Sequence, residues 1–291
     1  MKTTTTSIYL CLLTITFLFT YQSTKAQCHI DDWTALNAIY ENCNGRNWEN
    51  DNWDALFKDT DSPKEDCDLK TIRGNSYFGA ILTGDRISSL KLLGSNVNNV
   101  IPSEIELLIE LTYFSLNQTK IVGIPDEIGN LVKLEELYFY LNSQVILPST
   151  IGNLVNLKIL TLRSNNIRNI PKEIAFLDNL EILTITDELI REIIPEIGDL
   201  ESLDRLNVTK NRILTEPLPD NLGSLINLVS LDLSDNRIGG IVPAGFQNML
   251  NVETINLSDN EIIGLAGELG NLPNIRTLYL NNNRITKYQQ A

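Results

Sequence analysis

Aliphatic residues recur through most of this chain in a pattern of nearly fixed period. In each copy the first, fourth, sixth and eleventh places are nearly always aliphatic, as in Leu157, Leu160, Leu162 and Ile167. Apolar residues two places apart predict a short β-strand with one buried face. Successive copies start 23 to 25 residues apart. The nine copies begin at Ile87, Leu111, Leu134, Leu157, Leu180, Leu203, Leu228, Val252 and Ile275.

A second phrase lies between the strands and reads IPDEIGNL at 124–131, LPSTIGNL at 147–154 and LPDNLGSL at 218–225. Its proline opens a turn, and its aliphatic residues return the chain to the core. One copy offers about five aliphatic side chains worth about 1.5–3 kcal/mol each when buried. Ordering a copy's backbone costs about 1–2 kcal/mol per residue. A single copy therefore cannot fold alone, which predicts stacked coils with a parallel sheet along one side.

The ninth place of the repeat is polar although it follows a buried strand. A buried amide can donate to and accept from the backbone groups that lose their partners where a strand turns into a loop. We therefore predict a ladder of stacked asparagines. Glu188 fits this place poorly while charged and is expected to mark an altered coil. The ladder residues are Asn142, Asn165, Asn211, Asn236, Asn260 and Asn283, with Ser95, Thr119 and Glu188 in the other copies.

The pattern LxxLxLxxNxIxGxIPxxIGxL resembles that of the leucine-rich repeat family, and the resemblance covers residues 87–285. It is closest to the plant-type class of 23–24-residue repeats, which secreted bacterial and protist proteins also contain. The resemblance implies an α/β solenoid, a right-handed superhelix with a parallel β-sheet on its concave side and short turns or 3-10 segments on its convex side. The segment DDWTALNAIYENCNGRNWENDNW at 31–53 resembles the amino-terminal cap of such proteins. It lacks the paired cysteines common in plant caps, which favours a bacterial or protist secreted protein.

The two ends of the chain differ from the repeats. Residues 1–26 carry an apolar run too short to span a bilayer and end in a small residue, which predicts a secretory signal peptide. Residues 27–86 are then the cap, with a helix that starts at Asp31 or Asp32. The tryptophans of the chain, at 33, 48 and 53, are expected to fill this cap. The solenoid takes residues 87–291 and its last coil has no visible cap, so this edge is expected to pair with another domain or a second copy.

The mature chain would contain three cysteines, Cys28, Cys43 and Cys67. An exported protein is expected to form a disulfide, and the odd number leaves one thiol over. Cys28 and Cys43 flank the expected cap helix, which would hold them too far apart to bond. Cys67 is then the partner of one of them, and we favour Cys28–Cys67.

The net charge of the chain limits the kinds of partner that it can be expected to bind. The chain has a net charge of −14. Removing residues 1–26 takes away Lys2 and Lys25 and no acid, which leaves 21 basic against 37 acidic residues, or −16. Such a chain repels nucleic acid and anionic lipid and favours a basic protein or peptide, although charge that merely keeps the surface soluble is the simpler interpretation. With no later apolar segment long enough to cross a membrane, we predict a secreted, extracellular or cell-surface protein without membrane insertion.

The sequence contains few of the residues and motifs that enzymes use for catalysis. The only histidine is His29, so triads that need a histidine base and histidine-rich metal sites are excluded. No glycine-rich phosphate loop follows a strand. We therefore expect no enzyme activity, no cofactor and no metal site.

Binding is the remaining function class. Side chains beside the buried strand positions, at the second, third, fifth, seventh and eighth places, are expected to cover the concave face. A tyrosine cluster flanked by arginine is typical of an interface hot spot, although exposed strands favour aromatic residues in any case. Asp232 with Asp235 and Asp259 could attract a basic partner or calcium, but turn chemistry alone predicts these residues. The candidate binding residues are Tyr113, Tyr138, Tyr140, Arg163, Arg205, Asp232 and Tyr279.

These features favour a secreted recognition module that binds a protein or peptide on its concave face. Two alternatives stay open from the sequence. The chain could be the ectodomain part of a larger receptor-like or enzyme-bearing protein, or a stand-alone hydrolase that acts through concave carboxylates.

Overall fold

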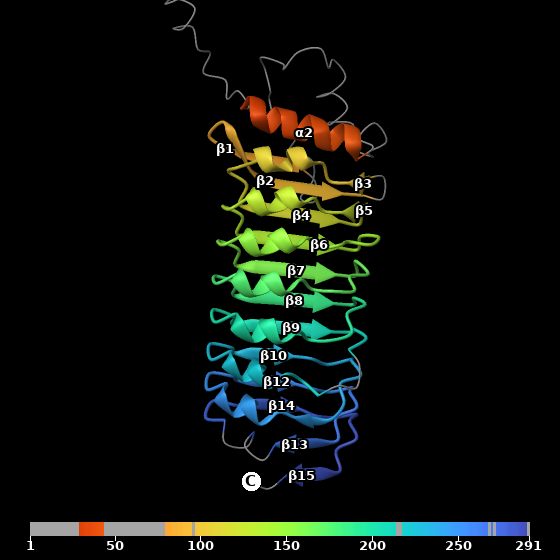
Figure 1. Cartoon of the computed structure of the whole chain (residues 1–291), viewed down its shortest axis with the longest axis vertical. Coiled ribbons are helices and arrows are strands. Elements are labelled where there is room, and N and C mark those ends of the chain that lie inside the picture. The colour runs from red at the N-terminus through yellow and green to blue at the C-terminus, as the bar shows by residue number, and fades with distance from the viewer. Residues whose placement is uncertain are drawn as a thin grey trace, which may run out of the picture.

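The computed structural model describes residues 29–43, 79–94, 97–213, 217–266, 269 and 272–289. Its coils are stacked in the order of the sequence, from the helix α2 at one end to the strand β15 at the other (Figure 1). The α/β solenoid is therefore confirmed.

The main sheet has ten strands in the order β1-β2-β4-β6-β7-β8-β9-β10-β12-β14. β1 pairs with β2 in antiparallel orientation, and every later neighbouring pair is parallel. The strands are β1 (Gly79–Thr83), β2 (Arg86–Leu93), β4 (Tyr113–Asn117), β6 (Glu136–Tyr140), β7 (Ile159–Arg163), β8 (Ile182–Thr186), β9 (Arg205–Thr209), β10 (Ser230–Asp232), β12 (Thr254–Asn256) and β14 (Thr277–Tyr279). Equivalent places of neighbouring copies face each other, as in Leu137 beside Leu160 and Leu160 beside Leu183. The repeat is thus in register from coil to coil.

Short 3-10 helices cover the other side of the core, in front of the strands in Figure 1. They are η3 (Ser103–Leu107), η4 (Asp126–Asn130), η5 (Ser149–Asn153), η6 (Lys172–Phe176), η7 (Pro195–Asp199), η8 (Asp220–Ser224) and η9 (Ala244–Asn248). Most begin after an extended proline such as Pro148, whose φ is −72°. A Cβ atom on Gly223 would lie 1.9 Å from the carbonyl oxygen of Gly245, so only glycine allows these coils to approach so closely.

Two smaller parallel sheets lie on the loops that follow the main strands. One joins β3 (Asn98–Val100) to β5 (Lys120–Gly123), and the other joins β11 (Ile241–Val242), β13 (Gly264–Ala266) and β15 (Lys287–Gln289). The aliphatic places of the repeat fill the space between the main sheet and the helices. Phe114 and Phe139 are fully buried there, with ring centroids 6.3 Å apart in an edge-to-face arrangement.

Each strand ends in a left-handed turn at the eighth place of the repeat. From the second copy to the ninth, φ at this place lies between 52° and 57°, and the first copy has Gly94 with φ of 118°. Asp, Asn and Gly tolerate this conformation, which explains why most copies use small polar residues here. Gln118, Leu141 and Lys210 are the exceptions.

The ninth-place asparagines connect each coil to the one before it. Their side-chain NH2 groups donate to the sixth-place carbonyl of the preceding copy, as Asn236 does to Val208 at 2.8 Å and Asn260 to Leu233 at 2.9 Å. Their carbonyl oxygens accept a backbone N–H from that same copy, as Asn236 does from Asn211 at 3.0 Å. Asn283 is half-buried, and the other five are buried.

Replacing Asn236 with Leu should lower the free energy of unfolding by about 1–3 kcal/mol, because the backbone groups of Asn211 and Val208 lose a buried partner. Urea unfolding followed by circular dichroism would measure the loss. The exposed Asn169 is a matched control, since Asn169→Leu removes no buried hydrogen bond. Equal stability of the two variants would contradict a structural role for Asn236.

The helix α2 (Ile30–Asn42) covers the first coil. It begins at Ile30, one or two residues earlier than predicted, because His29 caps it and its Nδ1 accepts the N–H of Asp31 at 3.3 Å. Asp32 is instead buried, where it accepts the N–H of Ile87 at 2.5 Å and pairs with Arg86 Nη2 at 2.7 Å. Arg86 Nη2 also donates to the carbonyl of Leu107 at 2.7 Å, which links helix, strand and coil.

The rest of the predicted cap is only partly described. Trp33 packs against the core from α2, whereas Trp48 and Trp53 lie outside the described residues. Cys43 is buried at the end of α2, and burial raises the pKa of its thiol to about 12. Cys28, Cys67 and residues 1–26 also lie outside the described residues, so the disulfide, the signal peptide and the boundaries at 26 and 86 stay predictions.

Candidate ligand-binding surface

The concave face is formed by the third, fifth and seventh places of each repeat. Side chains of a strand alternate between the two faces of a sheet, and in β6 and β8 the fourth and sixth places are buried while these three are half-buried. The eighth place lies in the left-handed turn after the strand, so residues such as Leu141 and Lys210 line the edge of the sheet and not its face. The predicted assignment of this place to the concave face is wrong for that reason.

Three tyrosines meet on this face near its amino-terminal end. The ring centroids of Tyr113 and Tyr138 are 5.3 Å apart, and those of Tyr138 and Tyr140 are 5.8 Å apart with nearly parallel planes. Register explains the contact, because Tyr113 faces Glu136 on the next strand and Tyr138 is two places along that strand. All three side chains are half-buried, so part of each stays accessible to solvent. We call Tyr113, Tyr138 and Tyr140 the tyrosine cluster.

Charged groups surround the tyrosine cluster. Lys91 Nζ lies 4.9 Å from the ring centroid of Tyr113, and the hydroxyl of Tyr138 donates to Glu136 Oε2 at 2.7 Å. Burial, together with this bond to Glu136, raises the pKa of Tyr138, so the phenol stays protonated at neutral pH. Arg163 is exposed beside Tyr140 in the next strand. The cluster and its neighbours therefore offer aromatic surface, hydroxyl groups and charges of both signs within four successive coils.

The apolar surface continues beyond the cluster along the third-place column. Ile159 and Ile182 follow Glu136 in register and are half-buried. At the edge, Leu141 is 49% exposed directly after Tyr140. Half-exposed aromatic and aliphatic side chains that share one face are the composition of a protein-binding patch.

Leu141 holds a backbone conformation that does not suit it. Its φ is 55°, and a left-handed conformation costs an ordinary L-residue about 1–2 kcal/mol. Most other copies have Asp, Asn, Ser or Gly at this place, and only Gln118 and Lys210 also have longer side chains there. Strain of this kind at an exposed apolar residue beside the tyrosine cluster favours a role in binding.

Replacing Leu141 with Asn should therefore raise the free energy of unfolding by about 1 kcal/mol. Thermal and urea unfolding would measure the gain. Ile146→Asn is the control, because Ile146 is an exposed apolar residue of the same coil, 69% accessible and without a positive φ. A stability gain of the same size in both variants would show that the loss of exposed apolar surface, and not backbone strain, is responsible.

The other predicted binding residues are spread along the sheet and do not join the tyrosine cluster. Arg205 lies on β9, paired in register with Ile182 and Ser230, and it contacts the carboxylate of Asp204 at 3.2 Å. Asp232 Oδ1 accepts the N–H of Ser234 at 3.0 Å and its hydroxyl at 2.7 Å, so it stabilises the turn after β10. Tyr279 is 49% exposed on β14, two strands beyond Asp232.

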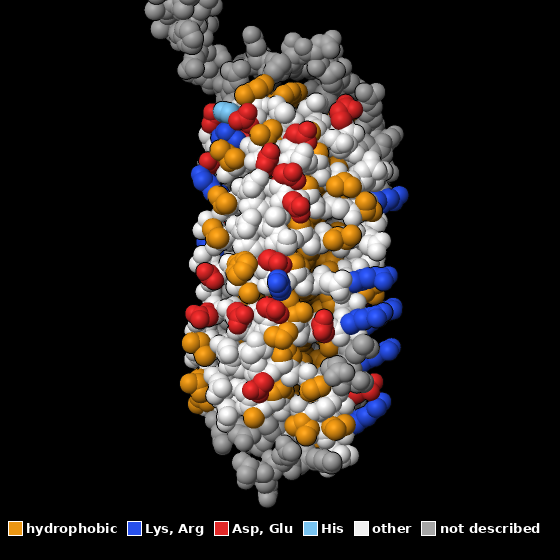
Figure 2. Space-filling view, in the orientation of Figure 1, with side chains coloured by type: hydrophobic (Ala, Val, Ile, Leu, Met, Phe, Trp, Pro, Cys, Tyr) orange, Lys and Arg blue, Asp and Glu red, His pale blue; other side chains and the backbone are white. Residues whose placement is uncertain are grey.

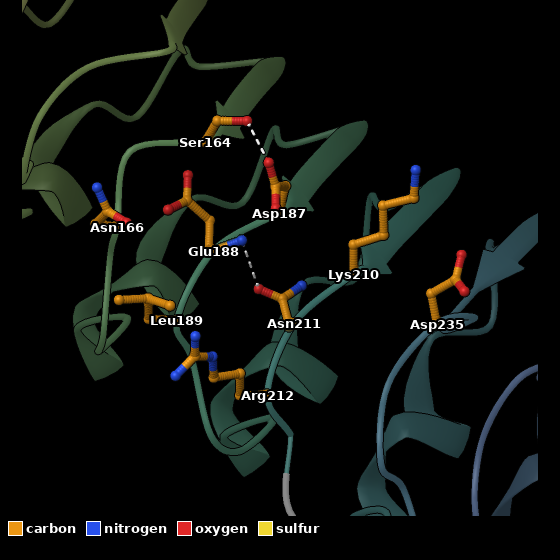
Figure 3. Close-up of a pocket in the computed structure, with 9 residues that line it drawn as sticks. All are labelled: Ser164, Asn166, Asp187, Glu188, Leu189, Lys210, Asn211, Arg212 and Asp235. Carbon is orange, nitrogen blue, oxygen red and sulfur yellow. Dashed lines mark hydrogen bonds between the residues drawn. The ribbon is translucent and has the colours of Figure 1, made fainter.

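A hollow of about 580 Å³ lies at the edge of the sheet where β7 to β10 end (Figure 3). Sequence reasoning did not find it, because its lining comes from the turn places of four successive copies. Ser164 donates to Asp187 Oδ2 at 2.8 Å across its rim. Its lining residues are Ser164, Asn166, Asp187, Glu188, Leu189, Lys210, Asn211, Arg212 and Asp235.

Glu188 occupies the ladder position at the floor of this hollow and is 2% exposed. Its carboxylate accepts the backbone N–H of Asn165 at 2.9 Å, the side-chain NH2 of Asn165 at 2.8 Å and the N–H of Ile167 at 2.8 Å. The coil is thus not broken, and the glutamate replaces the asparagine as an acceptor. Burial raises the pKa of Glu188, although these donors oppose the shift.

A raised pKa in the folded state makes stability depend on pH. The stabilising contribution of Glu188 should be fully present below its unfolded pKa near 4.5 and be lost as pH rises through the higher folded value. Urea unfolding of the wild type and of Glu188→Gln at several pH values should therefore show their stability difference shifting against the wild type as pH rises. Glu181→Gln, which alters an exposed glutamate, serves as control, and parallel pH profiles for Glu188→Gln and the wild type would contradict the shift.

Two further kinds of feature were sought among the described residues, a metal site and a membrane-spanning helix. No group of three or more His, Cys, Asp or Glu side chains among them is placed to hold a metal ion. Likewise, no helix in the described ranges is long and apolar enough to cross a membrane.

Two protein-family models match the sequence. The one described as "Leucine rich repeat" matches residues 226–285, and the one described as "Leucine-rich repeat region" matches residues 86–188. Together they cover repeats at both ends of the solenoid. No curated protein sequence matches the chain.

Several solved structures resemble this one. The ectodomain of the receptor kinase GASSHO1/SCHENGEN3 from Arabidopsis thaliana, in complex with CASPARIAN STRIP INTEGRITY FACTOR 2, is 32% identical with a TM-score of 0.60 and matches 68% of this chain. The Arabidopsis receptor kinase HAESA, in complex with the peptide hormone IDA and the co-receptor SERK1, is 30% identical with a TM-score of 0.60 over 67% of this chain. A leucine-rich repeat protein of Leptospira interrogans is 30% identical with a TM-score of 0.52 over 65%. The chain covers 24%, 34% and 53% of these three proteins, respectively.

Proposed function

Because this chain is a leucine-rich repeat protein, we propose that it is a secreted, non-enzymatic recognition module that binds a protein or peptide on its concave face. The observation that carries the proposal is the tyrosine cluster. Three half-buried rings lie on an open sheet, the ring of Tyr138 in contact with the other two, and Lys91, Glu136 and Arg163 lie around them. Aromatic residues and arginine dominate the binding energy of protein interfaces.

The kind of ligand follows from the shape of the surface. Aromatic and aliphatic side chains extend from Tyr113 to Ile182 over four strands, which at about 4.8 Å per strand is some 14 Å. An extended peptide laid across these strands would contact the cluster with about four residues. The GASSHO1 structure contains CASPARIAN STRIP INTEGRITY FACTOR 2, and the HAESA structure contains the peptide hormone IDA, which supports a protein or peptide ligand. A basic residue in the ligand could form an ion pair with Glu136, and an acidic residue could form one with Arg163.

A second candidate is that the chain forms the ligand-binding part of a larger receptor-like or enzyme-bearing protein. The similarity to receptor-kinase ectodomains, of which this chain covers only 24% and 34%, supports this alternative. Sequencing the native transcript beyond the codon for Ala291 would decide between the two candidates.

Mapping the footprint of a captured ligand tests the concave-face proposal. The chain would be used to capture partners from the native culture medium, and hydrogen–deuterium exchange would be compared with and without each partner. We expect added protection in β4 and β6 and in the turn at Leu141. Protection confined to η3–η9 would place the ligand on the opposite side and contradict the proposal.

A further inference from the structure

Arginines line the edge of the solenoid where the strands end. Figure 2, which shows the side covered by the 3-10 helices, has a row of Lys and Arg side chains along this edge. The fourth to seventh copies contribute one exposed arginine each, namely Arg168, Arg191, Arg212 and Arg237. We call these four residues the arginine edge. It stands out on a chain with a net charge of −14.

Like charges follow one another along this edge. Arg212 and Arg237 both hold the tenth place, and their N–H groups donate to Ile190 and Ile213, the eleventh places of the preceding copies, at 3.1 and 3.2 Å. Arg168 and Arg191 both hold the twelfth place of adjacent copies. The four arginines lie in the loops after the strands, where adjacent coils are about 4.8 Å apart and like charges repel one another.

Elsewhere the chain pairs opposite charges between adjacent coils. Each of four basic side chains contacts a carboxylate of the preceding coil, and one of them, Arg284, holds the same tenth place as Arg212 and Arg237. The pairs are Lys133–Glu110 at 2.6 Å, Lys158–Glu135 at 2.8 Å, Arg276–Glu253 at 3.1 Å and Arg284–Glu261 at 3.1 Å. Among the described residues, no carboxylate pairs with the side chains of the arginine edge. Folding alone therefore gives no reason for this row.

We propose that the arginine edge binds a linear anionic polysaccharide that carries carboxylate or sulfate groups. A guanidinium group is planar and binds either anion with two parallel hydrogen bonds. This site is separate from the concave face and goes beyond the proposed function. It would attach the solenoid to a charged matrix while the tyrosine cluster stays free.

Spacing favours a polysaccharide over an acidic protein segment. The coils, each of which carries one of these arginines, repeat at about 4.8 Å, whereas same-side residues of an extended peptide repeat at about 6.8 Å, so the charges of such a peptide would not match successive coils. One sugar ring of an extended polysaccharide advances by about the distance between coils. The net negative charge of the chain does not prevent binding, because at physiological salt charges beyond about 8 Å are largely screened. Asp187 and Asp235 in the adjoining hollow confine the anion to the outer side of the edge.

Retention on immobilised polysaccharides tests this site. The probes are polygalacturonate for carboxylate, chondroitin sulfate for sulfate, uncharged dextran and a poly-glutamate peptide. We expect the wild type to bind at least one of the two anionic polysaccharides more tightly than it binds poly-glutamate. We expect no retention on dextran. Arg191→Gln with Arg212→Gln should weaken binding about tenfold or more and reduce the slope of log affinity against log salt by about 2, one for each arginine.

The matched control replaces two paired cations, Lys133→Gln with Arg276→Gln, and so removes the same charge elsewhere. This control should bind as the wild type does. The Tm of Arg191→Gln/Arg212→Gln should equal or exceed that of the wild type, since the change separates no ion pair and removes like-charge repulsion. The proposal is overturned if neither anionic polysaccharide is retained, if poly-glutamate binds as tightly, or if the control pair weakens binding equally.

Discussion

A chain that carries Tyr138→Ala and Tyr140→Ala together is expected to lose at least about 100-fold in affinity for its concave-face ligand. Hot-spot residues cost about 2 kcal/mol or more each when truncated, and two such losses combine to well over a factor of 100. Both rings are half-buried and stack on each other, so the change also removes the surface against which Tyr113 packs. The measurement is the dissociation constant for the captured ligand, by calorimetry or surface plasmon resonance.

Controls separate this effect from a loss of folding. Tyr279→Ala removes an exposed tyrosine of the same sheet, far from the cluster, and should leave affinity unchanged. Removing aromatic contacts worth about 0.5–1.5 kcal/mol should lower stability only modestly. Tyr138→Phe keeps the ring and loses only the hydroxyl bond to Glu136, so it should retain most of the affinity. Unchanged binding by the double variant would exclude the tyrosine cluster as the ligand site.

The largest effect on stability is expected at Asp32, where alanine should cost about 3–5 kcal/mol. Asp32 is 0% exposed and holds Arg86, whose side chain is only 14% exposed, so its removal leaves a buried guanidinium without a counter-charge. The backbone N–H of Ile87 also loses its acceptor. Because coils interact only with their neighbours, the loss should be concentrated in α2 and the first coil.

Urea unfolding would measure this loss, and hydrogen exchange would show whether α2 opens separately from the later coils. Asp31→Ala is the matched control, since Asp31 lies in the same first turn of α2 with its side chain 49% exposed, and it should cost little. Asp32→Ala combined with Arg86→Leu should recover part of the loss, because no buried charge then remains unpaired. Equal stability of Asp31→Ala and Asp32→Ala would disprove the link between cap and solenoid.

The fold could be predicted from the sequence because nine copies of the repeat each predict the same strand and the same turn. The alternation at places such as Leu160 and Leu162 assigns one face of each strand to the core, and constant spacing sets the register. The tyrosine cluster follows from the same two facts, since Tyr113 and Tyr138 occupy exposed places of adjacent copies. Sequence alone could not show which exposed residues lie together over longer distances, and so Arg205, Asp232 and Tyr279 were grouped with residues that lie several coils away.

Three features could not be predicted, for other reasons. The pair of Asp32 with Arg86 depends on how the helix α2 docks on the first strand, and no periodicity relates these two residues. The left-handed turn at the eighth place was visible only indirectly, through the frequency of Asp, Asn and Ser, and it moves Leu141 and Lys210 off the sheet face. Glu188 was expected to disturb its coil, but its second oxygen reaches Ile167 while the first serves Asn165, so three donors are satisfied together.

The direction of the asparagine bonds bears on how the chain is made. Each amide reaches back to a carbonyl of the coil already behind it, as Asn142 does to Leu116, Asn165 to Phe139 and Asn211 to Ile185. The side-chain NH2 group of a coil that leaves the ribosome thus finds its acceptor already made, whereas a backbone N–H of that coil, such as that of Asn211, waits for the amide oxygen of the next coil. Assembly can follow synthesis from the amino terminus, with α2 as the template on which the first turn is laid down.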